Sequence, residues 1–212
     1  RTRTRMPQPR SFLFDIGNVI CSFDFSLMLS RLQAQGHAKT ASPLSVIHAI
    51  KDAYESGTST DSAFISEAIE ATGFTGSPDE FIRIWCDIFT ENKQMTELIR
   101  SLAGQGHNLY LLSNTNRLHL DYLKRTYPAF TYFSGGIFSH EAGVMKPHEA
   151  IYRSAMEKFS LSAEETLYID DLPENINAGR LLGLKCHQYN PRRHQELIEW
   201  LSGEDIEGLS PA

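Results

Sequence analysis

The sequence predicts an α/β fold with a parallel sheet flanked by helices, and with a helical segment inserted after the first strand. Three observations indicate this fold class. Residues 11–14 form an apolar run that is too short for an amphipathic helix and is typical of a strand buried on both faces. Residues 21–92 carry helical periodicity without a convincing strand. After residue 93, short apolar runs alternate with helical patterns, as in a Rossmann-like core of βαβ units.

The same patterns divide the chain of 212 residues into three parts. The α/β core is predicted to comprise residues 11–20 and 93–212, and the helical insertion residues 21–92. Residues 1–10 are basic and contain prolines, so they are predicted to form a disordered, solvated tail. A chain of this length can bury a sizeable core and suits one domain with a large insertion.

Apolar stripes at helical spacing predict four helices in the insertion. They lie near residues 25–32, 46–54, 64–69 and 81–88. The third stripe follows Ser59-Thr60-Asp61 and the fourth follows Ser77-Pro78-Asp79-Glu80, which are typical N-terminal capping sequences. The apolar residues of the four stripes are expected to pack together as the core of the insertion.

The rest of the chain alternates predicted strands with predicted helices. The strands fall near residues 109–112, 136–139, 166–169 and 184–188, and the helices near 94–104, 116–126, 150–159, 173–182 and 191–201. Pro147 is expected to open the helix at 150–159. Strands joined by helices form a parallel sheet with right-handed crossovers. Their carboxyl ends therefore share one edge of the sheet, where ligands bind in open α/β folds.

Polar residues gather at this predicted edge. They are Asp15, Ser113-Asn114, Lys146 and Asp170-Asp171. Carboxylates in one confined site raise each other's pKa unless a cation intervenes. Mg²⁺ is a hard cation that binds one or two carboxylates together with water and substrate phosphate. Ser113 and the amides that start the following helix can bind phosphate oxygens. The edge is therefore predicted to bind Mg²⁺ and a phosphate group.

Two simpler interpretations of these residues stay open at this point. Asp15 is followed by Gly17-Asn18, and an aspartate in such a sequence can serve turn formation alone. Asp170-Asp171 is followed by Pro173, which is typical of a helix N-terminus, so the acids can cap that helix. A capping role and a metal-binding role are compatible.

In their order and placement, the motifs resemble those of the haloacid dehalogenase (HAD) superfamily of phosphohydrolases. The motifs are Phe14-Asp15, Leu112-Ser113-Asn114, Lys146-Pro147 and Ile169-Asp170-Asp171. The helical insertion resembles the mobile cap of the first subclass of that superfamily. Residues 14–19, 112–119 and 143–147 are similar to the bacterial α-D-glucose-1-phosphate phosphatase branch and to the N-terminal phosphatase domain of epoxide hydrolases.

The resemblance implies a role for each motif residue. Asp15 would be the nucleophile that forms an aspartyl-phosphate, while Ser113, Asn114 and Lys146 bind the phosphoryl group and neutralise its charge. Mg²⁺ would be held by Asp15, the main-chain oxygen of Gly17 and Asp171, with Asp170 and Asn175 supporting the metal-bound water. The function implied is a Mg²⁺-dependent phosphomonoester hydrolase for a small phosphorylated metabolite such as a sugar phosphate.

Gly17 departs from the pattern of the superfamily, which has a second acid two residues after the nucleophile. That acid protonates the leaving group, and general acid–base catalysis is typically worth about 10² to 10⁴-fold. Either the leaving group tolerates weak acid help, as in anomeric, acyl or aryl phosphates, or another group replaces the acid. His119, His140 and His148 lie near the motifs in sequence, but each is expected to have a surface or capping role.

Two other functions compete with the phosphatase. A 2-haloacid dehalogenase would use the same aspartate without a metal, and the Asp170-Asp171 pair argues against it. A catalytically weak HAD-like binding or regulatory protein is favoured by Gly17 and disfavoured by the retained motif residues. For an active enzyme, specificity should lie in the cap, where the turn at residues 54–58 is the candidate to face the site; a plain turn between helices fits equally well.

Composition and charge exclude some classes of binding partner. The formal net charge of −6 gives no basic surface for nucleic acid, and no apolar run approaches the roughly 20 residues of a membrane span. Three widely spaced cysteines argue for a reducing compartment, against a disulfide framework and against a zinc site. We therefore expect a cytoplasmic protein that binds neither nucleic acid nor membranes. The oligomeric state does not follow from the sequence.

Overall fold

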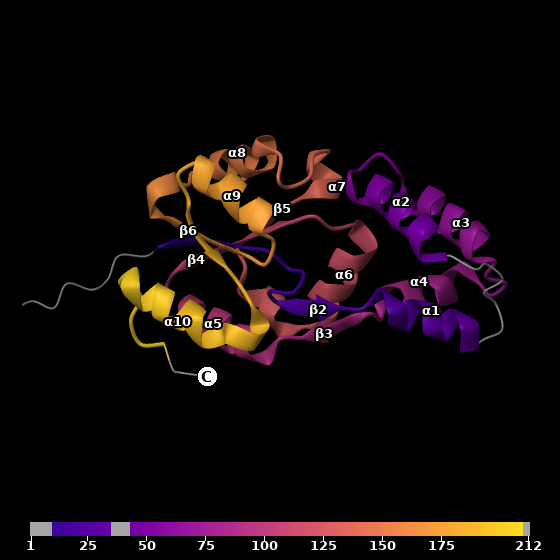
Figure 1. Ribbon diagram of the computed structural model, residues 1–212, viewed down its shortest axis with the longest axis horizontal. Helices are drawn as coiled ribbons and strands as arrows, with labels where there is room; N and C mark the ends of the chain where they lie inside the picture. The colour runs from indigo at the N-terminus through magenta and orange to yellow at the C-terminus, as the bar shows by residue number, and fades with distance from the viewer. Residues whose placement is uncertain (1–9, 35–42, 210–212) are drawn as a thin grey trace, which may run out of the picture.

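A five-stranded sheet, flanked by helices on both faces, forms the centre of the molecule in the computed structural model, which describes residues 10–34 and 43–209 (Figure 1). The strands are β1 (Ser11–Phe14), β4 (Asn108–Ser113), β5 (Gly136–Phe138), β6 (Thr166–Asp170) and β7 (Lys185–Gln188). Their order is β5-β4-β1-β6-β7, and every neighbouring pair is parallel. The predicted fold class is confirmed, and β1 lies at the middle of the sheet.

Strand β1 is buried on both faces because its side chains alternate between two hydrophobic clusters. Phe12 and Phe14 pack with residues of α5 (Lys93–Gly104) and α10 (His194–Gly203). Leu13 packs on the opposite side with residues of α8 (Glu149–Lys158) and α9 (Pro173–Leu181). Figure 1 shows these two pairs of helices on opposite faces of the sheet.

The insertion forms the four predicted helices. They are α1 (Phe25–Ala34), α2 (Pro43–Glu55), α3 (Asp61–Thr72) and α4 (Pro78–Cys86). Their buried aromatic and aliphatic side chains form a cluster of their own, which includes Phe64, Phe81 and Trp85. Both predicted N-terminal caps are present: Thr60 accepts a hydrogen bond from the Ala63 amide, and Ser77 forms a capping box with Glu80. Local sequence therefore sets where α3 and α4 begin.

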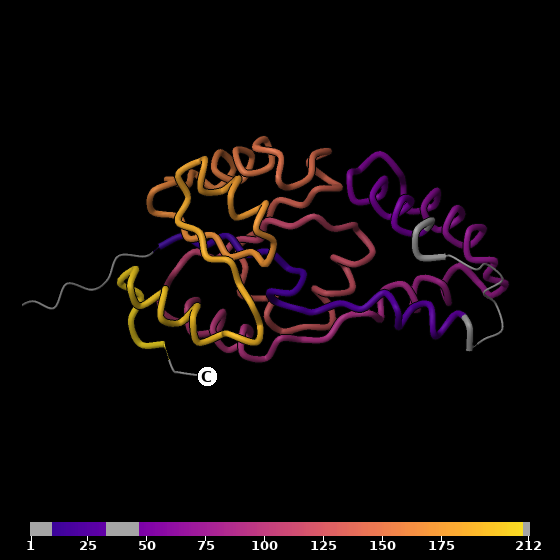
Figure 2. Tube along the Cα trace, viewed as in Figure 1, coloured from indigo at the N-terminus to yellow at the C-terminus, as the bar shows by residue number. Residues whose placement is uncertain are grey.

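Two short strands connect the core to the insertion, although no strand was expected in residues 21–92. They are β2 (Cys21–Phe23) and β3 (Phe89–Glu91), which pair antiparallel so that Phe23 lies opposite Phe89. Figure 2 shows the two connecting segments running side by side between the core and the helices. Three residues are too few to display the alternation of a strand, which is why the periodicity missed this pair.

The remaining helices are α6 (Arg117–Thr126) and the single turn α7 (Ser139–Ala142), together with three short 3₁₀ segments, η1 (Pro128–Tyr132), η2 (Ala163–Glu165) and η3 (Pro191–Arg193). The expectation that Pro147 opens α8 is wrong. His148 is the N-cap of α8, and its Nδ1 atom accepts a hydrogen bond from the Ala150 amide. Pro147 precedes that cap in a cis peptide with Lys146.

Most of the predicted tail lies outside the described residues, since only Arg10 of residues 1–10 is described. The Arg10 amide donates to His107 Nδ1 at 3.0 Å, and its guanidinium lies 3.8 Å from a carboxylate oxygen of Glu204. The chain is therefore anchored to the core by residue 10. None of the helices in residues 10–34 and 43–209 has the length and apolar character that crossing a membrane requires.

Candidate active site

Asp15 directly follows β1 and lies at the carboxyl edge of the sheet. Its amide donates to the Ile169 carbonyl of the neighbouring strand at 3.0 Å, which fixes the backbone at this point. Asp15 is buried, with 7% of the residue exposed, and its Oδ1 atom lies 2.9 Å from Lys146 Nζ. Burial raises the pKa of Asp15 to about 7 against the opposing effect of Lys146. A cation that fits this site would restore the ionised form.

Lys146 is the buried cation of the site. Its Nζ atom donates to Asp170 Oδ2 at 2.6 Å and to the Leu112 carbonyl at 2.8 Å, besides contacting Asp15. Burial alone would lower its pKa, but the two carboxylates outweigh that effect and raise the pKa above its usual value. The Asn114 side chain holds the Lys146 backbone through two hydrogen bonds, of 2.8 Å to the amide and 3.0 Å to the carbonyl. Lys146 is thus fixed at both ends.

Asp170 already has partners on both carboxylate oxygens. Oδ1 accepts from the Leu172 amide at 2.9 Å, Oδ2 accepts from the Tyr168 hydroxyl, and Asn175 Nδ2 lies 3.1 Å from each oxygen. Lys146 lowers the pKa of Asp170 despite the opposing effect of burial. Leu172, and not either acid, occupies the N-cap position of α9. Asp170 is therefore held as an ionised carboxylate that orients its neighbours.

Asp171 lines the cavity and is held by Asn18. Asn18 Nδ2 donates to Asp171 Oδ2 at 3.0 Å. Asn18 has a φ of 55°, in the left-handed region that asparagine tolerates better than most residues. Burial raises the pKa of Asp171. The sequence interpretation had assigned Asn18 only to a turn, and its contact with Asp171 across the sheet edge was missed.

The Ser113 hydroxyl is buried beside Asp15 and lines the cavity. A serine hydroxyl at this position can donate a hydrogen bond to a ligand in the cavity. The expectation of free amides at the start of the next helix is only partly met. The Thr115 amide donates to Ser139 Oγ at 3.0 Å, and the His119 amide donates to Asn116 Oδ1 at 3.0 Å. These two amides are therefore already engaged within the protein.

A cavity of about 530 Å³ opens between the sheet edge and the helical insertion. This volume is typical of a small-molecule site. Residues from the predicted motifs line it together with Phe23, Phe25 and Phe89, which belong to β2, α1 and β3. Of the turn at residues 54–58, Glu55 lines the cavity, whereas the Tyr54 ring stacks on Phe64 inside the insertion, with 4.4 Å between ring centroids. The predicted turn thus contributes one side chain.

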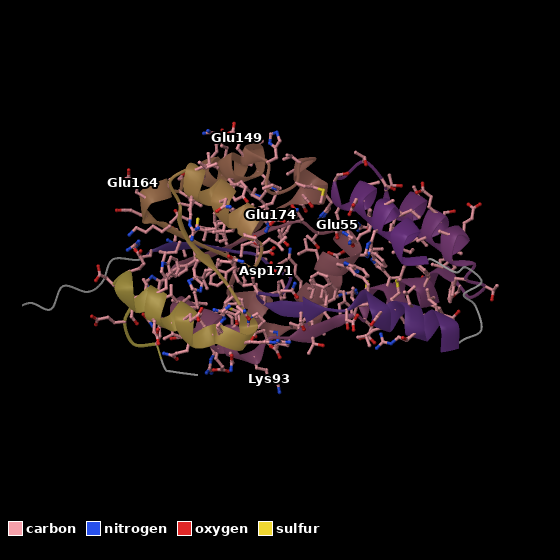
Figure 3. The ribbon with its side chains drawn as sticks, viewed as in Figure 1. Glu55, Lys93, Glu149, Glu164, Asp171 and Glu174 are labelled. Atoms are coloured by element: carbon pink, nitrogen blue, oxygen red, sulfur yellow. The ribbon has the colours of Figure 1, made fainter. Side chains whose placement is uncertain are left out.

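Helix α2 presents a polar stripe to this cavity. His48, Lys51, Asp52 and Glu55 follow the i, i+3, i+4, i+7 spacing of one helix face and all line the cavity. Lys51 Nζ lies 2.8 Å from Glu55 Oε2, and burial raises the pKa of Glu55. Figure 3 shows Glu55 where α2 approaches the core, while Glu149 lies on the outer side of α8. The sequence had indicated only the apolar side of this helix.

The three histidines have different surroundings. The surface or capping role expected for His119 is wrong, since His119 is buried and its ring stacks on Trp85 with centroids 4.6 Å apart. Its two ring nitrogens lie 3.0 Å from Asn116 Nδ2 and 3.1 Å from the Trp85 carbonyl. His140 is partly buried against the Thr115 carbonyl, at 2.8 Å. Only His148 shows the expected capping role, at the start of α8.

We predict that His119 makes the protein less stable in acid. Burial lowers the pKa of His119 to about 3, so the folded state keeps it neutral while the unfolded state binds a proton below about pH 6.5. The unfolding free energy should fall, by at most about 1.4 kcal/mol per pH unit, as the pH drops from 6.5 toward 3. The difference in unfolding free energy between wild type and His119→Gln, measured by urea denaturation, should become smaller as the pH falls to 4.

The exposed His148 provides the matched control, because His148→Gln also removes an imidazole. If the difference in unfolding free energy between wild type and His119→Gln stays constant from pH 7 to pH 4, His119 is not a neutral, buried side chain.

Three carboxylates lie close enough to hold one metal ion. Asp15, Asp170 and Asp171 each offer an oxygen atom, and these atoms lie within 4.8 Å of one another. When ionised, the three carboxylates together with the Lys146 ammonium leave two negative charges in excess, which one divalent cation balances. The donors are all hard oxygen atoms, as Mg²⁺ prefers. Both oxygen atoms of Asp170 accept hydrogen bonds, so Asp15 and Asp171 are the better candidates to contact the ion.

A family model for haloacid dehalogenase-like hydrolases matches residues 9–183. The chain belongs to this family. The match covers β1, the insertion and every motif that meets at the cavity, so the geometry above is that of a HAD-like hydrolase.

Two curated relatives of this HAD-like hydrolase carry phosphatase names. The D-ribitol-5-phosphate phosphatase of Bacteroides thetaiotaomicron is 25% identical over 188 residues, which cover 84% of this chain and 91% of that protein. The sesquiterpene phosphatase astK of Aspergillus oryzae is 31% identical over 91 residues. That second match covers 43% of this chain and under half, 46%, of the relative's length.

Solved structures share the fold. A HAD family enzyme of Bacteroides thetaiotaomicron, crystallised as the wild type with magnesium and inorganic phosphate, is 22% identical and superposes with a TM-score of 0.75. The superposition covers 87% of this chain and 96% of that one. The helical insertion and the core therefore occur together in a known HAD enzyme.

Proposed function

We propose that this HAD-like hydrolase is a Mg²⁺-dependent phosphomonoester hydrolase that works through an aspartyl-phosphate on Asp15. One observation carries the proposal. Asp15 lies at the cavity wall, 2.9 Å from the buried Lys146 ammonium and close to two further acids, and Ser113 lines the same cavity. A carboxylate so placed can attack phosphorus while Lys146 offsets the charge that gathers on the phosphoryl oxygens.

In the proposed reaction, an oxygen of Asp15 forms a bond to phosphorus as the bond to the leaving-group oxygen breaks. Ser113 and the Asn114 backbone hold the phosphoryl oxygens, and Lys146 keeps Asp15 and the phosphoryl group together. Water then hydrolyses the acyl phosphate and regenerates the Asp15 carboxylate. Asp15, the Gly17 carbonyl and Asp171 would hold the Mg²⁺, which offsets phosphoryl charge when bound.

Asp170 and Asn175 act on the proposed site through their hydrogen bonds rather than by contact with substrate. Asn175 Nδ2 bonds both oxygens of Asp170, which in turn holds the Lys146 ammonium. This leaves Asp15 and Asp171 as the acids proposed to contact the metal directly. The arrangement supports the division of roles that the motif resemblance implied.

The helical insertion, residues 21–92, is proposed to act as a cap that contacts the leaving group. It supplies the aromatic residues of β2 and β3 and the polar stripe of α2 to the same cavity as Asp15. A sugar phosphate suits such a cavity, because its ring can pack on the aromatic side chains while its hydroxyls bond to the charged groups. The similarity to a ribitol-phosphate phosphatase supports a small phosphorylated metabolite as the substrate. We retain the cytoplasm as the proposed location.

The competing dehalogenase function is less well supported. A metal-free site has no use for three carboxylate oxygens within 4.8 Å, because each charge raises the pKa of the others. A binding or regulatory protein would not need a cavity-lining Asp15 carboxylate 2.9 Å from the Lys146 ammonium, with Ser113 in the same cavity. The phosphatase accounts for both features.

We expect phosphate release from a panel of sugar phosphates, nucleotides and acyl phosphates to require Mg²⁺. With EDTA the rate should fall to the background of the assay, and added Mg²⁺ should restore it. Mg²⁺ at 100 times its dissociation constant should also stabilise the fold by about 2.7 kcal/mol, which raises the melting temperature. Turnover of a 2-haloacid in EDTA, or phosphate release that is unchanged by EDTA, would contradict the proposal.

A further inference from the structure

Gly17 lies at the cavity wall two residues after Asp15, and its missing side chain leaves a space that another residue fills. A Cβ atom built on Gly17 would lie 2.9 Å from Phe23 Cε1, which is closer than real Cβ contacts come. The other near atoms, at 3.4 and 4.0 Å, also belong to the Phe23 ring. Gly17 is not among the described residues of positive φ, so its backbone would accept a side chain. The Phe23 ring is the obstacle.

Strand β2 fixes the Phe23 ring in that space. Phe23 pairs with Phe89 across the β2–β3 ladder, and its ring contacts the Phe25 and Phe89 rings with centroids 5.7 and 6.4 Å away. Both contacts are edge-to-face, the arrangement that aromatic pairs prefer. Phe23 nevertheless remains 41% exposed and lines the cavity. An open aromatic face therefore borders the nucleophile where the superfamily pattern has a carboxylate.

Outside the motifs, the other titratable side chains that line the cavity have partners or contacts of their own. On α2, Lys51 pairs with both Asp52 and Glu55, at 3.1 and 2.8 Å. His119 bonds through both ring nitrogens, as described above. His48, at the far end of the α2 stripe, lies against the Phe25 ring, with centroids 6.0 Å apart. Within the described residues, these titratable groups belong to α2 and α6. The side chain that borders Gly17 is the ring of Phe23.

We propose that Phe23 takes the place of the acid at position 17 and selects phosphate groups whose leaving group departs without a proton from the enzyme. This inference rests on the proposed phosphatase function. Aryl, acyl and anomeric phosphates belong to this substrate class. The Asp15 oxygen forms the bond to phosphorus, and the leaving-group oxygen departs with the electron pair of the broken bond. Solvent protonates that oxygen afterwards where it needs a proton. The leaving group packs on the Phe23 face.

The coupling of Gly17 and Phe23 changes what a single substitution can reveal. Gly17→Asp restores a carboxylate but also drives its Cβ atom into the Phe23 ring, so a loss of activity would not tell a harmful acid from a steric clash. Phe23→Ala in the same chain removes the ring and frees the space. Gly17→Asn with Phe23→Ala is the matched control, because asparagine has the shape of aspartate and cannot donate a carboxylic proton.

The experiment measures kcat/KM for an aryl ester, p-nitrophenyl phosphate, and an alkyl ester, glycerol phosphate. Wild type should prefer the aryl ester by about 10² to 10⁴-fold, the usual worth of a general acid. Gly17→Asp alone should lower both values. The double variant, Gly17→Asp with Phe23→Ala, should have a kcat/KM for glycerol phosphate at least about tenfold above that of Phe23→Ala alone. Its kcat/KM for p-nitrophenyl phosphate should not rise by the same factor. The asparagine control should show no such gain.

Three results would overturn the inference. The first is equal cleavage of both esters by wild type. The second is a gain in alkyl-ester cleavage by Gly17→Asp alone that matches the gain of the double variant. The third is a gain by the asparagine control that matches the gain of the aspartate variant. Any of these leaves the phosphatase itself standing, since phosphate is still released. No phosphate release from either ester by wild type with Mg²⁺, together with none from the wider panel, would instead overturn the proposed function.

Discussion

Replacing Asp15 with asparagine is expected to reduce phosphate release by roughly 10⁴-fold or more, because removal of a nucleophile abolishes the covalent route. Asparagine keeps the shape of the side chain but cannot attack phosphorus as a carboxylate. The substitution also removes one of the two acids that face Lys146 Nζ, at 2.9 Å. The lysine keeps Asp170 as its partner, so the fold should survive. Phosphate release and a thermal melt of the same sample test both parts.

Asp24→Asn provides the matched control for Asp15→Asn. Asp24 follows β2 and accepts a hydrogen bond from the Ser26 amide at 2.8 Å on the protein surface, a role that asparagine fills equally well. Its activity should equal that of wild type. If Asp15→Asn retains more than a few per cent of wild-type activity, with the fold intact, Asp15 is not the nucleophile.

Replacing Lys146 with methionine is expected to destabilise the folded protein by about 3 to 5 kcal/mol and to abolish activity. Removing one partner of a buried ion pair leaves an uncompensated charge, which costs about this much. Here the loss would leave the carboxylates of Asp15 and Asp170 without the cation that lies 2.9 and 2.6 Å from them. Urea denaturation at pH 8 in EDTA measures the effect, and Lys93→Met, an exposed lysine, serves as control (Figure 3).

The instability of Lys146→Met should depend on pH. Asp15 already has a pKa raised to about 7 by burial, and the loss of Lys146 removes the main effect that opposes burial. A carboxyl group with a raised pKa in the folded state costs stability above that pKa, and the cost disappears as the pH falls and the group is protonated. The difference from wild type should therefore shrink between pH 8 and pH 5. An equal difference in unfolding free energy at pH 8 and at pH 5 would contradict an effect of charge.

The sequence was enough to bring the motif residues together, because parallel strands place their carboxyl ends along one edge whatever the side chains do. Asp15, Lys146 and Asp170 therefore could be predicted as neighbours. The lack of an acid at Gly17 was also visible in the sequence. The capping sequences of α3 and α4 were readable for a similar reason, since a cap depends on three or four consecutive residues.

The contacts that the sequence could not predict are those between segments far apart in the chain. Phe23 lies in a strand of three residues, and only its pairing with Phe89 brings its ring over Gly17. His119 looked like a surface residue because its burial depends on Trp85, 34 residues away in another helix. The bond from Asn18 to Asp171 spans 153 residues and requires a positive φ that periodicity does not report. None of these contacts leaves a local pattern.

The most direct test of the account is to trap the phosphorylated residue during turnover. Enzyme mixed with Mg²⁺ and p-nitrophenyl phosphate is quenched in acid and reduced with borohydride, which converts an aspartyl-phosphate to homoserine that peptide mass spectrometry can locate. We predict homoserine at position 15, only when substrate and Mg²⁺ are both present, and none in Asp15→Asn. Homoserine at another aspartate, or continued phosphate release without any trapped residue at position 15, would contradict the central role of Asp15.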